Sequence, residues 1–342
     1  MAHISFACLE DLAAIMNFIN KNWRNGHVLA VDKTLFLHEF YCPKNNRLNI
    51  AIARLEENNE LVGIFCFLPY SLNTDCDLSG SMWMVLEDKS DEILLGLKLR
   101  KYVIENVNHR FFGTPGPGIQ TRLIYQTLHM DWFRMKHYFV RNAKNNSNLI
   151  GKFPSYLKPV DPAPYEASIC LVNRDCIEKF PFHKFSHIAP LKDAWYLGHK
   201  YLHHPIHNYH VYHLQNIDKE CLFICRIQKF QNSKVYRMVD FIGEENLMPL
   251  VVSFLQNYIT ENDCEYVDFL SHGFDPKIMK LSQWQEVDFE SNEIIIPNHF
   301  GPFKRENIPV YCVSDRNPSL KVRFCKADGD QDRPSFYQKS RN

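Results

Sequence analysis

The sequence has no excess of one charge: 39 Lys and Arg residues balance 39 Asp and Glu residues. No overall field therefore favours nucleic acid or an anionic membrane. No stretch approaches the ~20 consecutive apolar residues of a membrane-spanning helix. The first residues, MAHISFACLEDLAAIM, lack the basic region and apolar core of a signal peptide. We therefore expect a cytoplasmic protein with no membrane span and no nucleic-acid partner.

Metal-binding spacings are also missing. The 11 cysteines are scattered, and the one close pair, Cys221 and Cys225, lies in the apolar run CLFIC. Such a run predicts buried free thiols. Five histidines fall within residues 203–213, but none of them forms an HExxH pattern that would fix zinc geometry. We predict no metal site.

At 342 residues the chain is long enough for about two domains of ~150 residues each. The polar, proline-rich segment 143–165 is the best candidate for a linker. We therefore predict an N-terminal domain at residues 1–150. A C-terminal domain with a tail would then occupy residues 151–342.

The order of predicted elements is the most informative feature. In the first half it is a strand, a helix, a strand, a second helix and a closing strand, at Ser81–Glu87, Asp88–Asn106, Arg110–Gly113, around Tyr125 and at Lys136–Val140. A similar order recurs at 235–296, and antiparallel strands precede both copies. This predicts an α/β (α+β) fold of two domains in tandem. Each would be a mixed, mostly antiparallel sheet flanked by helices.

The segment DEILLGLKLRKYV opens the first of these helices. A helix N-terminus offers free N–H groups and a positive dipole end, which suit a pyrophosphate. The segment resembles the R/Q-x-x-G-x-G/A pattern of the GNAT superfamily of N-acyltransferases. Gly96 falls on the last small position, whereas Leu94 replaces the first glycine and Asp91 replaces the usual Arg or Gln. An ordinary amphipathic helix is the alternative.

The GNAT resemblance implies acetyl-CoA or another acyl-CoA as the acyl donor. It implies that Met84, Val85, Leu86 and Gly96 bind this cofactor, with backbone N–H groups at 84–86 holding the oxyanion. Tyr125 matches the tyrosine that protonates the departing thiolate. A core tyrosine on an amphipathic helix is the alternative.

Acids and a histidine lie where two predicted strands end. Asp240 ends YRMVDF, Asp268 lies near the end of EYVDFL, and His272 follows the second strand. Such groups can accept a proton from an amine. We predict His272 or Asp268 as the general base and Asp240 as a substrate contact. Polar residues that cap turns are the alternative.

The loop FGTPGPG at 112–118 follows a buried strand, and loops in this position often line a ligand crevice. The tail KADGDQDRPS begins like a calcium loop, but Arg333 stands where that loop needs glycine. We expect Asp330, Asp332 and Arg333 of this tail, with His204, to contact a sugar.

The tail and the segments 201–205 and 295–300 resemble tandem GNAT-fold acyltransferases encoded in bacterial surface-polysaccharide clusters. The resemblance implies transfer of an acyl group to the amine of an amino sugar, possibly nucleotide-linked, for surface glycan synthesis. The protein would act as a monomer or homodimer. A Fem-like aminoacyl-tRNA-dependent transferase and a non-catalytic carbohydrate-binding pseudoenzyme are the alternatives.

Overall fold

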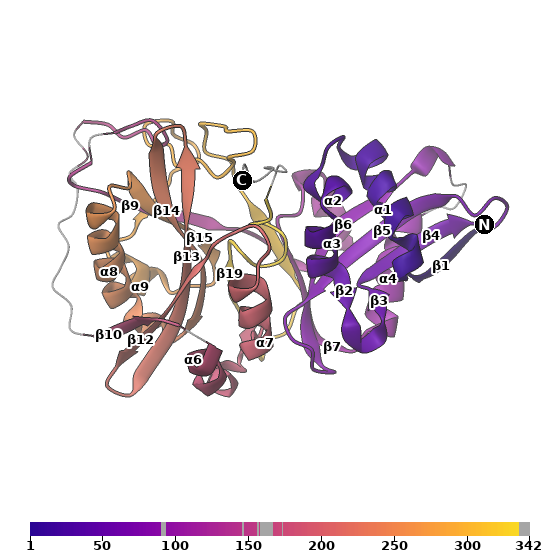
Figure 1. Cartoon of the computed structure of the whole chain (residues 1–342), viewed down its shortest axis with the longest axis horizontal. Helices are drawn as coiled ribbons and strands as arrows, with labels where there is room; N and C mark the ends of the chain where they lie inside the picture. The colour runs from indigo at the N-terminus through magenta and orange to yellow at the C-terminus, as the bar shows by residue number, and fades with distance from the viewer. Residues whose placement is uncertain (90–93, 146, 156, 158–166, 173, 335–342) are drawn as a thin grey trace. The chain divides into compact units, whose positions relative to one another are not determined.

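The computed structural model describes residues 1–89, 94–145, 147–155, 157, 167–172 and 174–334. Contacts divide the chain into two compact units (Figure 1). Unit 1 is Met1–Thr114 together with the segment that begins at Arg333, and unit 2 is Pro115–Asp332. The contacts thus separate at residue 114, before the boundary at 150 that the linker composition predicts.

Unit 1 is built on five strands in the order β1-β4-β5-β6-β7. Their bounds are β1 Ala2–Phe6, β4 Ile50–Leu55, β5 Leu61–Pro69, β6 Cys76–Val85 and β7 His109–Pro115; the helices are α1 Leu12–Phe18, α2 Val28–Val31, α3 Lys33–Phe40 and α4 Leu95–Asn106, with a short ladder of β2 Tyr41–Cys42 and β3 Arg47–Leu48. All pairs are antiparallel except β6 with β7, which are parallel because α4 crosses between them.

Helices cover both faces of the unit 1 sheet. Ile64 and Cys66 of β5 belong to the core that α1, α2 and α3 form. Gly63 faces the other way, and a Cβ there would lie 2.9 Å from the Leu99 side chain of α4. This alternation explains why β5 reads LVGIFCFLP, a nearly continuous apolar run with both faces buried.

Unit 2 contains the larger sheet, in the order β10-β12-β13-β14-β15-β9-β16, with β19 also paired to β15. The strands are β9 Lys136–Arg141, β10 Ser168–Leu171, β12 His210–Asn216, β13 Lys219–Phe230, β14 Ser233–Gly243, β15 Tyr266–His272, β16 Gln285–Glu286 and β19 Phe324–Cys325. Shorter pairs are β8 Asp131–Arg134 with β17 Tyr311–Ser314, and β11 Ile188–Ala189 with β18 Lys321–Val322. The α-helices are α5 Arg122–Thr127, α6 Arg174–Lys179, α7 Ala194–Leu197, α8 Met248–Glu261 and α9 Pro276–Leu281.

The two units repeat one plan. In each, three antiparallel strands lead to a fourth strand, a helix crosses over, and the next strand returns parallel to the fourth. The crossing helix is α4 in unit 1 and α8 in unit 2. This confirms the predicted fold of two mixed sheets flanked by helices.

Two predicted strands behave differently from expectation. The strand at 136–140, expected to close the first half, is β9 and pairs antiparallel with β15 of the second sheet. Residues 292–296, expected to form a strand, make only an isolated bridge between Ile295 and Lys152. Both errors concern pairing partners that are more than 100 residues apart, which local patterns do not specify. Among the described residues, no helix is both long and apolar enough to cross a membrane.

Candidate functional site at two strand divergences

In unit 1 the parallel pair β6 and β7 separates before either strand ends. Pairing runs from Cys76 with His109 to Ser79 with Gly113. Beyond that point β6 continues to Val85 and β7 continues past Thr114. We call the region between Gly80–Val85 and Thr114 the unit 1 divergence. Among the described strands, β6 pairs only with β5 and β7.

A β-bulge lies at the start of this divergence. The register with β5 shifts between Phe65 and Phe67, so Ser81 and Met82 of β6 face a single residue. Bulges of this kind bend a strand and re-aim its backbone groups, and they are common beside active sites. Val85 lies farther along the divergence. Leu86 donates its N–H to Val62 of β5 at 2.8 Å, so the alternating backbone directs the Val85 N–H to the other edge.

The first position of the divergence has no side chain. A Cβ built on Gly80 would lie 2.5 Å from Oγ1 of Thr114. The Thr114 hydroxyl is itself buried and has no hydrogen-bond partner in the described part of the chain. An orphaned buried hydroxyl costs about 1–3 kcal/mol unless something pairs with it. The pair thus forms a small polar cradle suited to a ligand group.

Arg333 lies at the same bulge. It donates to the Ser81 hydroxyl at 2.9 Å and to both carboxylate oxygens of Glu39 on α3. Its side chain is only 8% exposed. The sequence predicted Arg333 as a substrate contact, and the structure places it beside the unit 1 divergence. Glu39 and Ser81 were not predicted, because neither belongs to a recognisable motif.

Gly96 has a packing role at the start of α4. A Cβ on Gly96 would meet Nε1 of Trp83 at 2.9 Å. Trp83 of β6 therefore packs against Gly96 in the first turn of α4, at the small residue that the GNAT pattern places beside phosphate. Asp91 of the same pattern lies outside the described residues.

Unit 2 has the equivalent divergence, between β14 and β15. Parallel pairing ends at Met238 with Phe269. A register shift next to this point places a bulge at Val239 of β14. Both units therefore carry a bulge on the fourth strand, one to three residues beyond the last parallel pair.

The unit 2 divergence is filled by the chain itself. Residues 324–328, which we call the plug segment, contain β19, and Cys325 pairs with Ser271 of β15. On the other side, Ala327 donates its N–H to the Val239 carbonyl at 2.9 Å. The plug segment thus bonds both strands at the place where unit 1 has its cradle.

Buried charges fix the plug segment. Lys192 binds Asp240 of β14 and also Asp328 of the plug, the latter at 2.8 Å. The Tyr201 hydroxyl donates to Asp240 at 2.5 Å. Burial alone would lower the pKa of Lys192, but the two carboxylates outweigh burial and raise it. Asp240, Cys325 and Asp328 have metal-like spacing, yet the Lys192 ammonium already supplies the cation.

Asp240, which the sequence predicted as a substrate contact, is fully buried within this network. Asp332 is likewise engaged. It binds Arg226 through both oxygens, at 2.7 and 2.9 Å, and accepts a hydrogen bond from Tyr209. Burial would raise the pKa of Asp332, but the Arg226 guanidinium lowers it well below the usual range.

The carboxylate of Asp268 is occupied by two partners, whereas a general base needs a free carboxylate oxygen. Arg237 donates to both of its oxygens, and His137 lies 2.8 Å away. Burial would raise the pKa of Asp268, but Arg237 and the His137 hydrogen bond lower it far below its usual range. A carboxylate held in this way is a weak proton acceptor at neutral pH.

Tyr125 and His272 lie on opposite faces of β8. The Tyr125 ring is 6.3 Å from Trp132, and the His272 ring stacks on Phe133 at 4.3 Å. Because neighbouring residues of a strand point to opposite faces, the two side chains do not share one pocket. Burial lowers the pKa of His272 to about 4, so the imidazole is neutral at pH 7.

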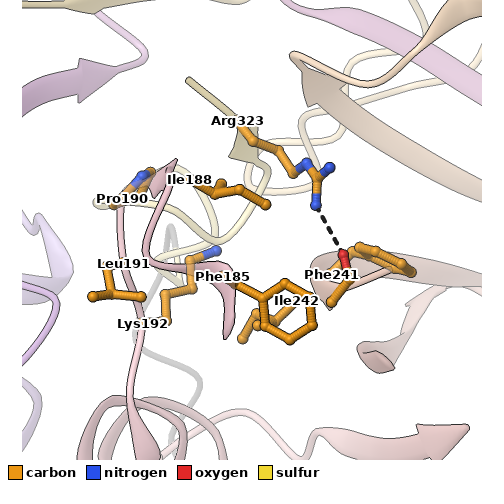
Figure 2. A pocket seen from close by; sticks show the side chains of 9 residues that line it. Phe185, Ile188, Pro190, Leu191, Lys192, Phe241, Ile242 and Arg323 are labelled. Carbon is orange, nitrogen blue, oxygen red and sulfur yellow. Dashed lines mark hydrogen bonds between the residues drawn. The ribbon is translucent and has the colours of Figure 1, made fainter. Parts of the chain in front are cut away.

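The two remaining predicted contacts have local partners. Nδ1 of His204 accepts from the backbone N–H of Ile206 and of His207. Asp330 accepts from the side chain of Gln331 at 3.1 Å. Unit 2 also encloses a cavity of about 20 Å³ between Phe185, Phe241 and Arg323 (Figure 2). Its volume suits one water molecule and is too small for a substrate.

Comparisons with known proteins agree with this architecture. No family model and no curated protein sequence matches the chain. The solved structure of a GCN5-related N-acetyltransferase from Anabaena variabilis matches with 10% sequence identity and a TM-score of 0.53. The match covers 92% of this chain and 72% of the Anabaena chain. A conserved Enterococcus faecalis protein, described as a probable N-acyltransferase, is 8% identical with the same TM-score and coverage. The chain therefore has the fold of GNAT-type acyltransferases.

Proposed function

We propose that this protein is an N-acyltransferase that moves an acyl group from acyl-CoA to an amine. The observation that carries the proposal is the unit 1 divergence, where a GNAT-type fold keeps an orphaned Thr114 hydroxyl beside Gly80. When bound, acyl-CoA supplies a thioester carbonyl that an amine can attack. The Val85 N–H and the Thr114 hydroxyl are the groups of unit 1 that would hydrogen-bond to this donor.

The comparison of the two units supports unit 1 as the donor-binding half. In unit 2 the plug segment already bonds the Val239 carbonyl and β15. A donor there would have to displace a buried ion-pair network, which costs several kcal/mol. For the acceptor we propose a nucleotide-linked amino sugar used in surface glycan synthesis.

For proton transfer we propose either His272 as base or Tyr125 as acid, because the two side chains lie on opposite faces of β8 and one site can use only one of them. The neutral imidazole of His272 can accept a proton, although a pKa of about 4 makes it a weak base. The Tyr125 side chain is buried, with 4% of its surface exposed, and its ring lies beside Trp132. Asp268 is the weaker candidate because Arg237 holds its carboxylate. The cytoplasmic location and the monomer or homodimer state stay predictions.

A carbohydrate-binding protein without acyl transfer is the second candidate. The packing of Trp83 on Gly96 favours it, because this contact occupies the expected phosphate position. The two functions differ in donor binding.

Thermal unfolding with acetyl-CoA, free coenzyme A and nucleotide-linked amino sugars separates them. A ligand at 100 times its Kd stabilises the folded state by about 2.7 kcal/mol. We expect coenzyme A species to raise Tm in the wild type and to raise it less in Thr114→Val. A rise with sugars alone would favour the second candidate and remove the role of Tyr125.

A further inference from the structure

A cationic hollow lies in unit 2, at the opposite end of β14 from the plug segment. Its volume is about 570 Å³. Its walls come from residues 144, 145, 147 and 149, from the hairpin of β13 and β14, and from Asp263 before β15. Ser233 lines the hollow and lies seven residues before Asp240 on β14. At ~3.3 Å per residue this is about 23 Å, so the hollow is separate from the divergence.

Three lysines line the hollow: Lys144, Lys229 and Lys234. Within the part of the chain that the structure describes, none of the three ammonium groups has an ion-pair partner. The lining includes one carboxylate, that of Asp263, which accepts a hydrogen bond from the Asn145 amide at 2.8 Å. Leu149 is the single apolar member of the lining. An unbalanced cationic hollow of this kind attracts anions in a salt-dependent way.

Two serines that line the hollow are held in place by Glu265, which is 1% exposed. Its carboxylate accepts hydrogen bonds from the hydroxyls of Ser147 and Ser233, at 2.9 and 2.6 Å. It also accepts from the backbone N–H groups of residues 149–151. Five donors thus compensate this buried charge and fix the loop against β14.

We propose that this hollow binds a small polyanion carrying at least two phosphate groups. Lys229 and Lys234 are partners across the β13–β14 hairpin, whereas Lys144 lies on a separate loop, so the lysines approach the hollow from two segments and can contact separate phosphates. The volume is in the range of small-ligand sites, about 300–1,000 Å³. The inference does not depend on acyl transfer, although coenzyme A and nucleotide sugars both carry a diphosphate.

Inorganic pyrophosphate is the probe, titrated by calorimetry into the full-length protein at low salt. We expect the triple variant K144Q/K229Q/K234Q to bind it at least about tenfold more weakly. K277Q removes an exposed lysine on α9 outside the hollow, and this control should bind like the wild type. Raising the salt to about 0.5 M should weaken wild-type binding and leave the triple variant little changed.

The same variants show whether the bound phosphates belong to coenzyme A or to a uridine diphosphate, and whether RNA competes for the hollow. Binding of coenzyme A or of a uridine diphosphate that is lost in the triple variant but kept in Thr114→Val assigns that ligand to the hollow. The proposal is wrong if pyrophosphate does not bind, or binds equally to the folded triple variant. It is also wrong if a short RNA duplex binds far more tightly than pyrophosphate through the same lysines, since the face would then recognise nucleic acid. Circular dichroism confirms that the triple variant is folded.

Discussion

The two units show two outcomes of one sheet plan in which the fourth strand carries a bulge. In unit 1 the strands separate after Ser79 and leave the Thr114 hydroxyl unpaired. In unit 2 they separate after Met238, and the plug segment fills the gap with β19 and the Ala327 hydrogen bond. The same geometry thus gives a candidate ligand site in one unit and a buried polar core in the other.

The difference lies in the residues that follow the divergence. Unit 2 commits Lys192, Asp240 and Asp328 to a closed network with very little exposure. Unit 1 contributes uncharged small groups, Gly80 and Thr114, whose contacts are incomplete. Stability should therefore depend on the unit 2 divergence, and ligand binding on the unit 1 divergence.

Removing the central cation of unit 2 should have the largest effect on stability. Lys192→Met leaves Asp240 and Asp328 buried without their shared partner, which costs about 3–5 kcal/mol. Urea unfolding followed by circular dichroism measures the change. The control is Lys321→Met, which removes an exposed partner of Glu245 and should cost less than about 1 kcal/mol. If both variants lose the same free energy of unfolding, the ion pairs of Lys192 stabilise the protein no more than an exposed ion pair does.

Acid should weaken unit 2 through its buried histidines. Burial lowers the pKa of His207 and of His272 to about 4, against about 6.5 in the unfolded chain. Between these values the unfolded chain binds protons that the folded chain does not. The free energy of unfolding therefore has its full value above pH 6.5 and falls as the pH drops toward 4.

Between pH 7 and pH 5 the two histidines together should cost roughly 3–4 kcal/mol. The raised pKa of Asp328, about 6, acts in the opposite direction and offsets part of it. Urea midpoints at several pH values measure the slope. The double variant H207Q/H272Q should show a flatter profile, and an unchanged slope would assign the acid sensitivity to other groups.

Thr114→Val should separate binding from stability in unit 1. The substitution replaces an unpaired buried hydroxyl by a methyl group of similar size, so the free energy of unfolding should stay within about 0.5 kcal/mol or rise. Acyl-CoA affinity should fall about tenfold. Calorimetric titration with acetyl-CoA tests this, and Thr121→Val is the control, since the Thr121 hydroxyl is paired with the Gly118 carbonyl at 2.7 Å. Unchanged affinity in Thr114→Val would move the donor site elsewhere.

Sequence patterns could predict the elements but not all of their partners. The apolar run of β5 and the amphipathic face of α8 are local signals, and both elements form as expected. The pairing of β9 with β15 joins residues about 130 apart, and the plug segment inserts from the end of the chain. Periodicity tells which face of a strand is buried, but not which distant strand covers its edge.

The site residues show the same division. The glycine- and proline-rich loop at 112–118 was a usable signal, and Thr114 belongs to it. Asp240, Asp268 and Asp332 had the right residue type for a site, but each has a buried cationic partner: Lys192, Arg237 and Arg226. The sequence contains those cations as well, yet nothing local pairs Asp332 with an arginine 106 residues away.

The smallest effect decides what Gly96 does. If Gly96 is small because Trp83 packs against it, Gly96→Ala pushes on the indole ring and should destabilise the protein by less than about 1 kcal/mol. The higher helix propensity of alanine offsets part of that cost. Acetyl-CoA affinity should change less than about twofold, in contrast to Thr114→Val. Loss of affinity without loss of stability would instead assign Gly96 the phosphate contact that the GNAT pattern gives it. The double variant Gly96→Ala with Trp83→Phe separates the two explanations, because phenylalanine keeps an aromatic ring but lacks the atom nearest to that Cβ. If Gly96 contacts phosphate, the double variant should bind acetyl-CoA as weakly as Gly96→Ala alone.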